Sequence, residues 1–289
     1  ILRNDCLIAN PHNSIEEIKL LMLNFRTEFM PVVDEAGNLI NVYFWEDLFA
    51  DTKLEPSVRF NLPVAIMAGG LGSRLKPFTN IIPKPLIPIG EKSILEEIFD
   101  RFAKYGCERF FISVNYKADL IRYYIKGLNL SYDINYFEEA KPLGTAGSLS
   151  LLKGKINQTF FVSNCDILID QDYSEILQYH NQNKNEITIV AALKHFPLAY
   201  GAIETGENGN LINLVEKPEL TFKVNSGMYI LEPNLIIEIP AETLFHITQL
   251  IEKLQQQGRR VGVFPVWQSS WLDIGDLEEY LHLIKNYKK

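Results

Sequence analysis

The segment MAGGLGSRLKPFTNIIPKPLIPIG, from Met67 to Gly90, carries the strongest fold signal in this sequence. It follows the short apolar run VAIMA and combines closely spaced glycines with cations and prolines, in a chain whose formal net charge is -8. Ligands of open α/β sheets bind beyond the carboxyl ends of the strands, which is where a strand over VAIMA would deliver this loop. The segment therefore predicts an anion site at the edge of a sheet.

The residue types in this loop suit a polyphosphate. Gly69, Gly70 and Gly72 let backbone N–H groups approach phosphate oxygens. Arg74 adds a forked cation, and Lys84 adds a second cation in a stretch that its flanking prolines stiffen. The spacing matches neither G-x-x-x-x-G-K-[ST] nor G-x-G-x-x-G. By themselves the residues predict a polyphosphate cradle, and a purely structural turn is the alternative.

Outward from this loop, apolar strand patterns alternate with helical ones. We expect strands over residues 109–115, 134–139, 159–169 and 186–193. We expect helices over residues 93–106, 117–127, 144–154 and 173–183. Residues 201–231 change to an antiparallel pattern, and a helix over 244–260, a strand over 261–266 and a helix over 276–287 follow. This order predicts an α/β fold with a mostly parallel, Rossmann-like doubly wound sheet and an antiparallel part.

The first part of the chain has a different character. Ser14 and Glu17 have the spacing of a capping box, and an apolar stripe at helical period follows them. MPVVDEAGNLINVYF predicts a hairpin that turns at residues 35–38, and residues 45–57 predict a short helix with a proline-marked exit. We therefore divide the chain into a small α+β segment, residues 1–58, and a larger domain, residues 62–289.

Composition excludes several classes of function. The acidic balance argues against nucleic acid, which needs a broad basic face, and no apolar run approaches the roughly 18 residues of a membrane span. Cys6, Cys107 and Cys165 are too widely spaced for a disulfide framework or a metal site, so we expect a reducing cytoplasm. The five histidines fit no metal spacing and are interpreted as structural. Because the sequence begins at Ile1, we expect it to be part of a longer protein.

The opening segment closely resembles the signature of sugar-1-phosphate nucleotidylyltransferases, G-G-x-G-x-R-L-x-P-x-T-x-x-x-P-K-P-L-x-P-I, and every fixed position is filled. Further segments similar to motifs of that family follow in the family's order: LGTAGSL (143–149), VSNCDIL (162–168), YGAIE (200–204), VEKP (215–218), VNSGMYI (224–230) and WLDIG (271–275). Cys165 stands where the family usually has glycine, which a residue with negative φ can replace. The resemblance extends over residues 62–289.

The resemblance implies a role for each matched residue. The expected catalytic cations are Arg74 and Lys84. The expected nucleotide contacts are Gly69, Gly70, Gly72, Leu143, Gly144 and Thr145. The expected ligands of Mg²⁺ are Asp166 and Asp273, both in apolar surroundings where a charge needs a partner. The expected contacts to the sugar phosphate are Gly201, Glu216, Lys217, Asn225 and Gly227.

The implied reaction transfers a nucleotidyl group from a nucleoside triphosphate (NTP) to a sugar 1-phosphate and releases pyrophosphate. LGTAG is similar to the loop of guanylyltransferases that act on mannose 1-phosphate or related hexosamine phosphates, so GTP is the favoured donor. The acceptor stays open between a hexose, a hexosamine and phosphocholine, the last as in a phosphocholine cytidylyltransferase. The rival hypothesis is a catalytically silent protein that senses a nucleotide-sugar; silent relatives usually lose the signature arginine or a metal aspartate, and both are present here.

The helix, strand and hairpin pattern of residues 1–58 resembles a single cystathionine-β-synthase-type (CBS) motif, of which MPVVDEAGNLI is the most specific part. Such motifs normally work in pairs, so an incomplete pair is expected. In that family a threonine and an aspartate three residues later often hold the ribose of an adenosine nucleotide. Here Phe44 takes the threonine position and Asp47 the aspartate position. We therefore favour a packing or homodimerisation module over a nucleotide sensor.

Overall fold

The computed structural model describes residues 7–25, 27, 29–44, 48 and 58–286, and it divides into two compact units, Ile1–Glu55 and Pro56–Lys289. The sequence pattern placed this division between residues 58 and 62. No helix in the described ranges is long and apolar enough to cross a lipid bilayer.

The first unit is a helix with a two-stranded sheet. Helix α1 (Ile15–Phe25) begins at the predicted capping box, in which the Glu17 N–H donates to Ser14 Oγ at 3.2 Å and the Ser14 N–H donates to Glu17 Oε2 at 3.0 Å. Strands β1 (Phe29–Val33) and β2 (Leu39–Phe44) are antiparallel, so the predicted hairpin is confirmed. Ala9, Ile18, Met22, Met30 and Val32 form the core of this unit. The helix expected over residues 45–57, including Asp47, lies outside the described residues.

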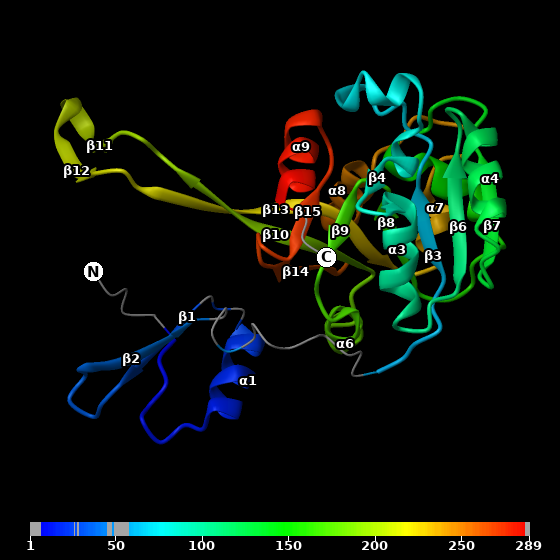
Figure 1. Cartoon of the computed structure of the whole chain (residues 1–289). Coiled ribbons are helices and arrows are strands. Elements are labelled where there is room, and N and C mark those ends of the chain that lie inside the picture. The colour runs from blue at the N-terminus through cyan, green and yellow to red at the C-terminus, as the bar shows by residue number, and fades with distance from the viewer. Residues whose placement is uncertain (1–6, 26, 28, 45–47, 49–57, 287–289) are drawn as a thin grey trace. The chain divides into compact units, whose positions relative to one another are not determined.

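The second unit is built on a seven-stranded sheet with the order β14-β10-β13-β8-β3-β6-β7 (Figure 1). The strands are β3 (Val64–Met67), β6 (Arg109–Val114), β7 (Asp133–Glu138), β8 (Phe160–Asn164), β10 (Ile187–Pro197), β13 (Glu219–Leu231) and β14 (Val261–Val266). Strand β13 runs antiparallel to its two neighbours, and the other neighbouring pairs are parallel. The predicted mostly parallel sheet is therefore confirmed.

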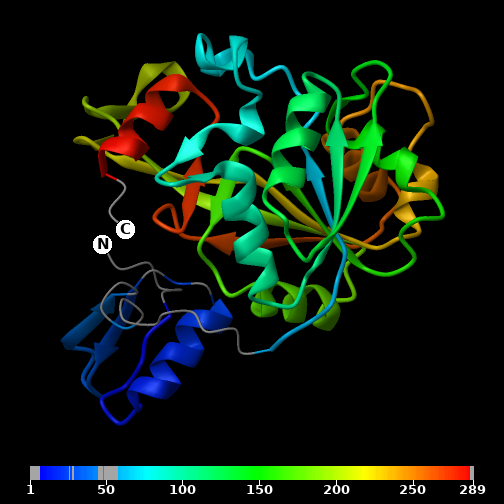
Figure 2. The same cartoon turned by 45° about the vertical axis from the view of Figure 1, so that its right-hand side comes forward.

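Helices cover both faces of this sheet. They are α3 (Ile94–Ala103), α4 (Ala118–Gly127), α5 (Gly144–Gly147), α6 (Tyr173–Gln182), α7 (Leu235–Glu238), α8 (Ile247–Gln256) and α9 (Leu277–Asn286). Successive residues of a strand point to opposite faces, and accordingly Val64 and Ile66 pack in one core cluster while Ala65 packs in the other. Figure 2 shows the teal helix α3 in front of the sheet and the orange-brown helix α8 behind it.

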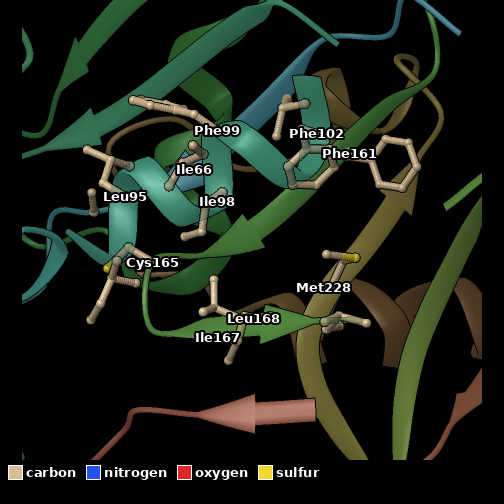
Figure 3. Packing of buried hydrophobic residues seen from close by; sticks show 14 of the residues in the cluster. Ile66, Leu95, Ile98, Phe99, Phe102, Phe161, Cys165, Ile167, Leu168 and Met228 are labelled. Carbon is tan, nitrogen blue, oxygen red and sulfur yellow. The ribbon is translucent and has the colours of Figure 1, made fainter. Parts of the chain in front are cut away.

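The larger core cluster joins α3 to the strands beneath it. Figure 3 shows Phe99 and Phe102 of α3 beside Ile66, with Phe161 of β8 next to Phe102. The Phe102 and Phe161 rings meet edge to face, with centroids 5.3 Å apart. Because α3 and β8 are buried against each other, the loops that leave β3 and β8 start from rigid positions.

One expected strand is broken in the structure. Residues 159–169 form β8 and a separate strand β9 (Ile167–Ile169), with a turn at Cys165 and Asp166. Strand β9 leaves the main sheet and pairs antiparallel with β15 (Trp271–Asp273). The prediction of one continuous strand was wrong because a run of apolar residues does not reveal a change of partner.

Strands β10 and β13 continue beyond the sheet. Strand β10 pairs with β14 only as far as Ala192, whereas it pairs with β13 as far as Pro197. Residues 193–223 thus form a two-stranded ribbon that ends in the small sheet of β11 (Ala202–Thr205) and β12 (Leu211–Val215). We call these residues the arm; Figure 1 shows it projecting away from the rest of the second unit.

Candidate active site

The opening loop leaves the carboxyl end of β3, at the centre of the sheet. It contains three short 3₁₀ turns: η1 (Ser73–Leu75), η2 (Phe78–Asn80) and η3 (Lys84–Leu86). Gly72 begins the first turn with a φ of 63°, and a Cβ there would lie 2.8 Å from the Thr79 side chain. Thr79 Oγ1 in turn donates to the Gly72 carbonyl at 2.9 Å. Glycine is therefore required at position 72 to fold the loop back on itself.

The loop places one cation in the interior and one at the opening. Lys84 is buried, and its ammonium pairs with the Asp166 carboxylate at the end of β8. Arg74 is exposed on η1 and faces the same space. The two residues that the resemblance names as catalytic cations are therefore brought together, although only Lys84 has a fixed counter-charge.

Asp166 and Asp273 lie far apart in the sequence and close together in the structure. The pairing of β9 with β15 sets Asp273 opposite Ile167, and the Ile274 N–H donates to the Asp166 carbonyl at 2.8 Å. Burial raises the pKa of Asp273, and the neighbouring charge of Asp166 raises it further. Two partly buried carboxylates that repel each other form a site that a divalent cation would stabilise.

The second glycine loop is fixed against the segment before α8. Gly144 has a φ of 80°, and a Cβ there would lie 2.7 Å from the Phe245 carbonyl oxygen. The same carbonyl accepts from the Ala146 and Gly147 N–H groups, at 3.0 Å and 2.9 Å. Thr145 Oγ1 accepts from the Ile247 N–H at 3.0 Å. Close approach of backbone to backbone thus explains the glycine at position 144.

A buried carboxylate, Glu139, lies between the two glycine loops. It accepts a hydrogen bond from the Ser113 hydroxyl and another, at 2.9 Å, from the Leu143 N–H. A Cβ on Gly69 would lie 2.8 Å from Glu139 Oε1, so the first loop passes directly over this carboxylate. Sequence reasoning missed Glu139; the only local signal is its position directly after a strand.

The loops line two neighbouring cavities that share lining residues. The first, which we call the loop pocket, has a volume of about 380 Å³. Its lining includes Gly69, Gly70, Gly72, Gly144 and Glu139. The second, which we call the bulge pocket, has a volume of about 360 Å³. Arg74, Thr145, Asn164 and Asp166 line both cavities, so a ligand in one would be in reach of a ligand in the other.

The bulge pocket is named for an irregularity in β13. Val190 pairs with Met228 and the next residue, Ala191, pairs with Asn225, so Ser226 and Gly227 are extra residues on β13. Bulges bend a strand and re-aim its side chains. Asn225 and Gly227 consequently line this pocket together with Asp273.

Three further residues of the bulge pocket escaped sequence reasoning. They are Tyr229, His246 and Trp271. Tyr229 accepts from Asn225 Nδ2 through its hydroxyl oxygen at 2.7 Å, which orients the amide. Tyr229 and Trp271 lie in the matched segments VNSGMYI and WLDIG but were given no role, and His246 was interpreted as structural. Only the tertiary fold places them at a cavity.

Four of the predicted site residues do not line either cavity. Leu143 is buried, and it contributes its N–H to Glu139. Gly201, Glu216 and Lys217 lie on the arm, where Glu216 and Lys217 are exposed. A Cβ on Gly201 would lie 2.9 Å from Glu216 Oε2, so these two residues are neighbours. The structure therefore groups the arm residues with one another, and none of them lines either cavity.

Cys165 lies in the loop pocket at the position where glycine is usual. Its φ is not positive, which explains why a residue with a side chain is accommodated. Burial raises the pKa of the Cys165 thiol to about 12, with a further contribution from the Asp166 charge. The thiol therefore stays protonated at neutral pH and is a poor nucleophile.

Comparison with known proteins finds relatives over the second unit. A family model described as nucleotidyl transferase matches residues 64–289. The mannose-1-phosphate guanylyltransferase catalytic subunit beta of Drosophila melanogaster is 30% identical over 233 residues, which are 78% of this chain and 63% of that protein. The chain thus spans less than two thirds of the length of that relative.

Solved structures give a similar result. HddC from Yersinia pseudotuberculosis superposes with a TM-score of 0.61 at 27% sequence identity, and the match covers 78% of this chain and 100% of that one. The structure of HddC complexed with GMP-PN superposes with a TM-score of 0.59, with the same identity and coverage.

Proposed function

The chain belongs to the nucleotidyl transferase family, and we propose that it transfers a guanylyl group from GTP to a sugar 1-phosphate, releasing pyrophosphate. The observation that carries this proposal is the pair of neighbouring cavities that share Arg74, Thr145, Asn164 and Asp166 in their linings. A triphosphate on the glycine loops and a phosphate in the bulge pocket would meet at these residues.

In this reaction an oxygen of the sugar phosphate attacks the α-phosphorus of the triphosphate. The new P–O bond forms as the bond between the α-phosphorus and the bridging oxygen breaks, and pyrophosphate leaves with that electron pair. Two anions must approach each other, so positioning and charge neutralisation dominate catalysis. Arg74 would neutralise charge at the junction of the pockets, and Lys84 would do so beneath the glycine loop.

The donor set fits magnesium. Mg²⁺ prefers carboxylate oxygens and usually keeps several waters, binding through one or two carboxylates plus substrate phosphates. Asp166 and Asp273 supply two carboxylates. Among the described residues, no cluster of three or more His, Cys, Asp or Glu side chains could hold a metal ion. Burial raises the pKa of Asp273 and the charge of Asp166 raises it further, so a divalent cation at this pair would favour the ionised form. We propose that these residues would hold Mg²⁺, which when bound supplies positive charge to the reacting phosphates.

The choice of guanine is supported from two directions. The HddC structure was solved in complex with GMP-PN, and the relative in Drosophila melanogaster is named a guanylyltransferase. The loop pocket contains Glu139, whose carboxylate can only accept hydrogen bonds when ionised. Guanine offers adjacent N–H donors on one edge, which suit such an acceptor. The acceptor sugar stays open between a hexose and a hexosamine phosphate.

Pyrophosphate release tests the proposal directly. The purified chain would be incubated with each of the four NTPs and Mg²⁺, against a panel of hexose 1-phosphates, hexosamine 1-phosphates and phosphocholine. We expect release with GTP and one class of sugar phosphate only. Tight binding of a nucleotide-sugar without turnover for any pair would favour the silent sensor, and turnover with CTP and phosphocholine would favour a cytidylyltransferase.

For residues 1–58 we propose a CBS-type packing or dimerising segment in a cytoplasmic enzyme. Support comes from the order of α1, β1 and β2 and from the exposed Phe44, which offers a ribose no hydroxyl. Thermal unfolding of the full chain and of a chain that lacks residues 1–58, each with and without AMP or ATP, tests this proposal. We expect the nucleotide to change the melting temperature of both chains equally.

A further inference from the structure

The arm exposes more apolar surface than the largest apolar patch of a typical monomeric protein. Ten of its large apolar side chains are more than a third exposed. At on the order of 100 Å² each, they present roughly 1,000 Å² of apolar surface, against a few hundred Å² for the largest patch of a typical monomer. A two-stranded ribbon is also only marginally stable by itself.

Exposed apolar side chains occur along both the ribbon and the tip of the arm. In the ribbon, Phe196 pairs with Leu220 and Lys194 with Phe222, so Phe196, Leu220 and Phe222 share a face. The ring centroids of Phe196 and Phe222 are 5.9 Å apart. At the tip, Ile203 pairs with Leu214, and both are more than half exposed. The ribbon therefore presents one apolar face, and the tip exposes apolar side chains on both faces of its small sheet.

The arm also carries three residues that the family resemblance assigns to the sugar-phosphate site. Gly201 lies beside Glu216, and Lys217 follows with a φ of 46°. Continuous pairing of β10 and β13 carries this tip roughly 15–20 Å beyond the sheet before the hairpin begins. In the structure, this pairing holds Gly201, Glu216 and Lys217 outside both cavities of their own chain.

Exposed apolar residues also occur in the segments that form the site. Leu71 and Ile81 of the opening loop are 61% and 75% exposed, and Leu244, two residues before His246 of the bulge pocket, is 59% exposed. One molecule therefore carries both an apolar arm and these exposed apolar residues, which we call the rim, beside an open pocket. Such self-complementarity suits a twofold interface, in which each subunit gives and receives the same contact.

From these observations we propose that two copies of this chain exchange arms, and that the arm of each copy lies across the rim and completes the bulge pocket of the other. Glu216 and Lys217 would then contact the acceptor phosphate and sugar in the partner's pocket; this part of the inference rests on the proposed function. The apolar area of each arm is close to the roughly 800 Å² per partner of a standard interface.

The oligomeric state tests arm exchange without reference to catalysis. Sedimentation of the full chain at micromolar concentration should give a dimer. The double variant Leu214→Lys, Phe222→Lys should be monomeric, because two charges would have to be desolvated in the interface. The control Tyr123→Lys, at an 80% exposed residue of α4, should stay dimeric. A monomeric wild-type chain, or an arm variant that remains dimeric, would overturn the proposal.

Complementation between two defective variants tests completion of the site in the partner. Asp166→Asn disables the pocket and leaves the arm intact, whereas Lys217→Met disables the arm tip and leaves the pocket intact. After the two are refolded together, half of the molecules should be mixed dimers with one intact site, giving about a quarter of the wild-type rate at limiting acceptor. Each variant alone should be impaired.

The outcomes distinguish a failure of the proposed function from a failure of arm exchange. If the wild-type chain releases no pyrophosphate with any substrate pair, the proposed function fails, and sedimentation still decides arm exchange. If the wild-type chain turns over but the mixture shows no rescue, the arm acts on its own chain or on neither, and completion of the partner's pocket is wrong. A Lys217→Met variant whose KM for the acceptor equals the wild-type value would also show that completion of the partner's pocket is wrong.

Discussion

The two aspartates have opposite relations to the surrounding charge. Asp166 pairs with the buried Lys84, whereas Asp273 is desolvated and repelled by Asp166. A carboxyl whose pKa is raised in the folded state destabilises that state above its unfolded pKa. Ionised Asp273 thus lowers the free energy of unfolding of the metal-free protein, and a bound cation would offset this loss.

We therefore expect Asp273→Asn to abolish Mg²⁺-dependent turnover and to raise the melting temperature measured in EDTA. Loss of a metal ligand should reduce kcat on the order of 100-fold or more. Asp166→Asn should also abolish turnover, but it should lower the melting temperature, because Lys84 would stay buried without its counter-charge. Asp119→Asn, at an exposed site on α4, is the control for both. Near-normal turnover in both variants would contradict the metal assignment.

Glu139 offers a test of base selection. Glu139→Gln keeps one acceptor oxygen and replaces the other with a donor, which would face a donor edge of guanine. We expect KM for GTP to rise about 10- to 100-fold, with a smaller change for ATP. Glu138→Gln alters the adjacent exposed carboxylate, which pairs with Arg122, and should leave both KM values unchanged. Equal effects on the two nucleotides would place Glu139 in a structural role.

At the scale of elements, sequence reasoning worked where a pattern is local. Strand β14 has the predicted bounds, and the helix expected over residues 93–106 is observed as α3, Ile94–Ala103. It failed where an element changes partner, as between β8 and β9, or outgrows its sheet, as in β10. Residues 193–197, LKHFP, carry no pattern that separates a strand inside a sheet from a ribbon outside it. Pocket residues such as Trp271 were missed for the same reason, because the pairing of β9 with β15 places them.

From the contacts between α6 and β10 we predict that the stability of the protein depends on pH. His180 of α6 is buried and bonds to Thr188 Oγ1 at 2.8 Å and to Glu232 Oε1 at 3.1 Å. Burial lowers the pKa of His180, with Glu232 opposing the shift. Between pH 6.5 and the lower native pKa only the unfolded chain binds this proton, so the free energy of unfolding should fall as pH falls, by up to about 1.4 kcal/mol per pH unit.

Urea titrations at pH 8 and pH 5.5 measure this loss. The variant His180→Gln should be less stable at pH 8 and should lose less stability on acidification than the wild type. The exposed His282→Gln serves as the control and should follow the wild-type profile. A His180→Gln variant with the full wild-type loss would show that other groups carry the pH dependence.

At the scale of the whole molecule, the two units have separate cores. The core of the first consists of residues between Ala9 and Val32, and the cores of the second begin at Val64. Phe60 also belongs to the second unit, because its ring stacks on Tyr105 and Phe161 with centroids 5.6 Å and 5.7 Å away. The boundary of an independent domain should therefore fall before this ring.

We expect a chain that lacks residues 1–58 to fold and to keep its turnover. Deletion of residues 1–62, which also removes Phe60, should cost about 3–5 kcal/mol of unfolding free energy, as loss of a packed aromatic ring usually does. Thermal unfolding and pyrophosphate release of the two truncations measure the difference. An insoluble or inactive 1–58 deletion would show that the units are not independent.

The pairing of β15 with β9 also determines when the site can form during synthesis. Asp166 and its lysine partner leave the ribosome long before Asp273, which lies roughly 100 residues later and emerges on the order of 5–20 seconds after it at ordinary rates of translation. A nascent or prematurely terminated chain can therefore present the glycine loop and a single carboxylate, but not the pair. If the proposed function is correct, incomplete translation products would bind nucleotide without converting it, and turnover would begin only when β15 has been made.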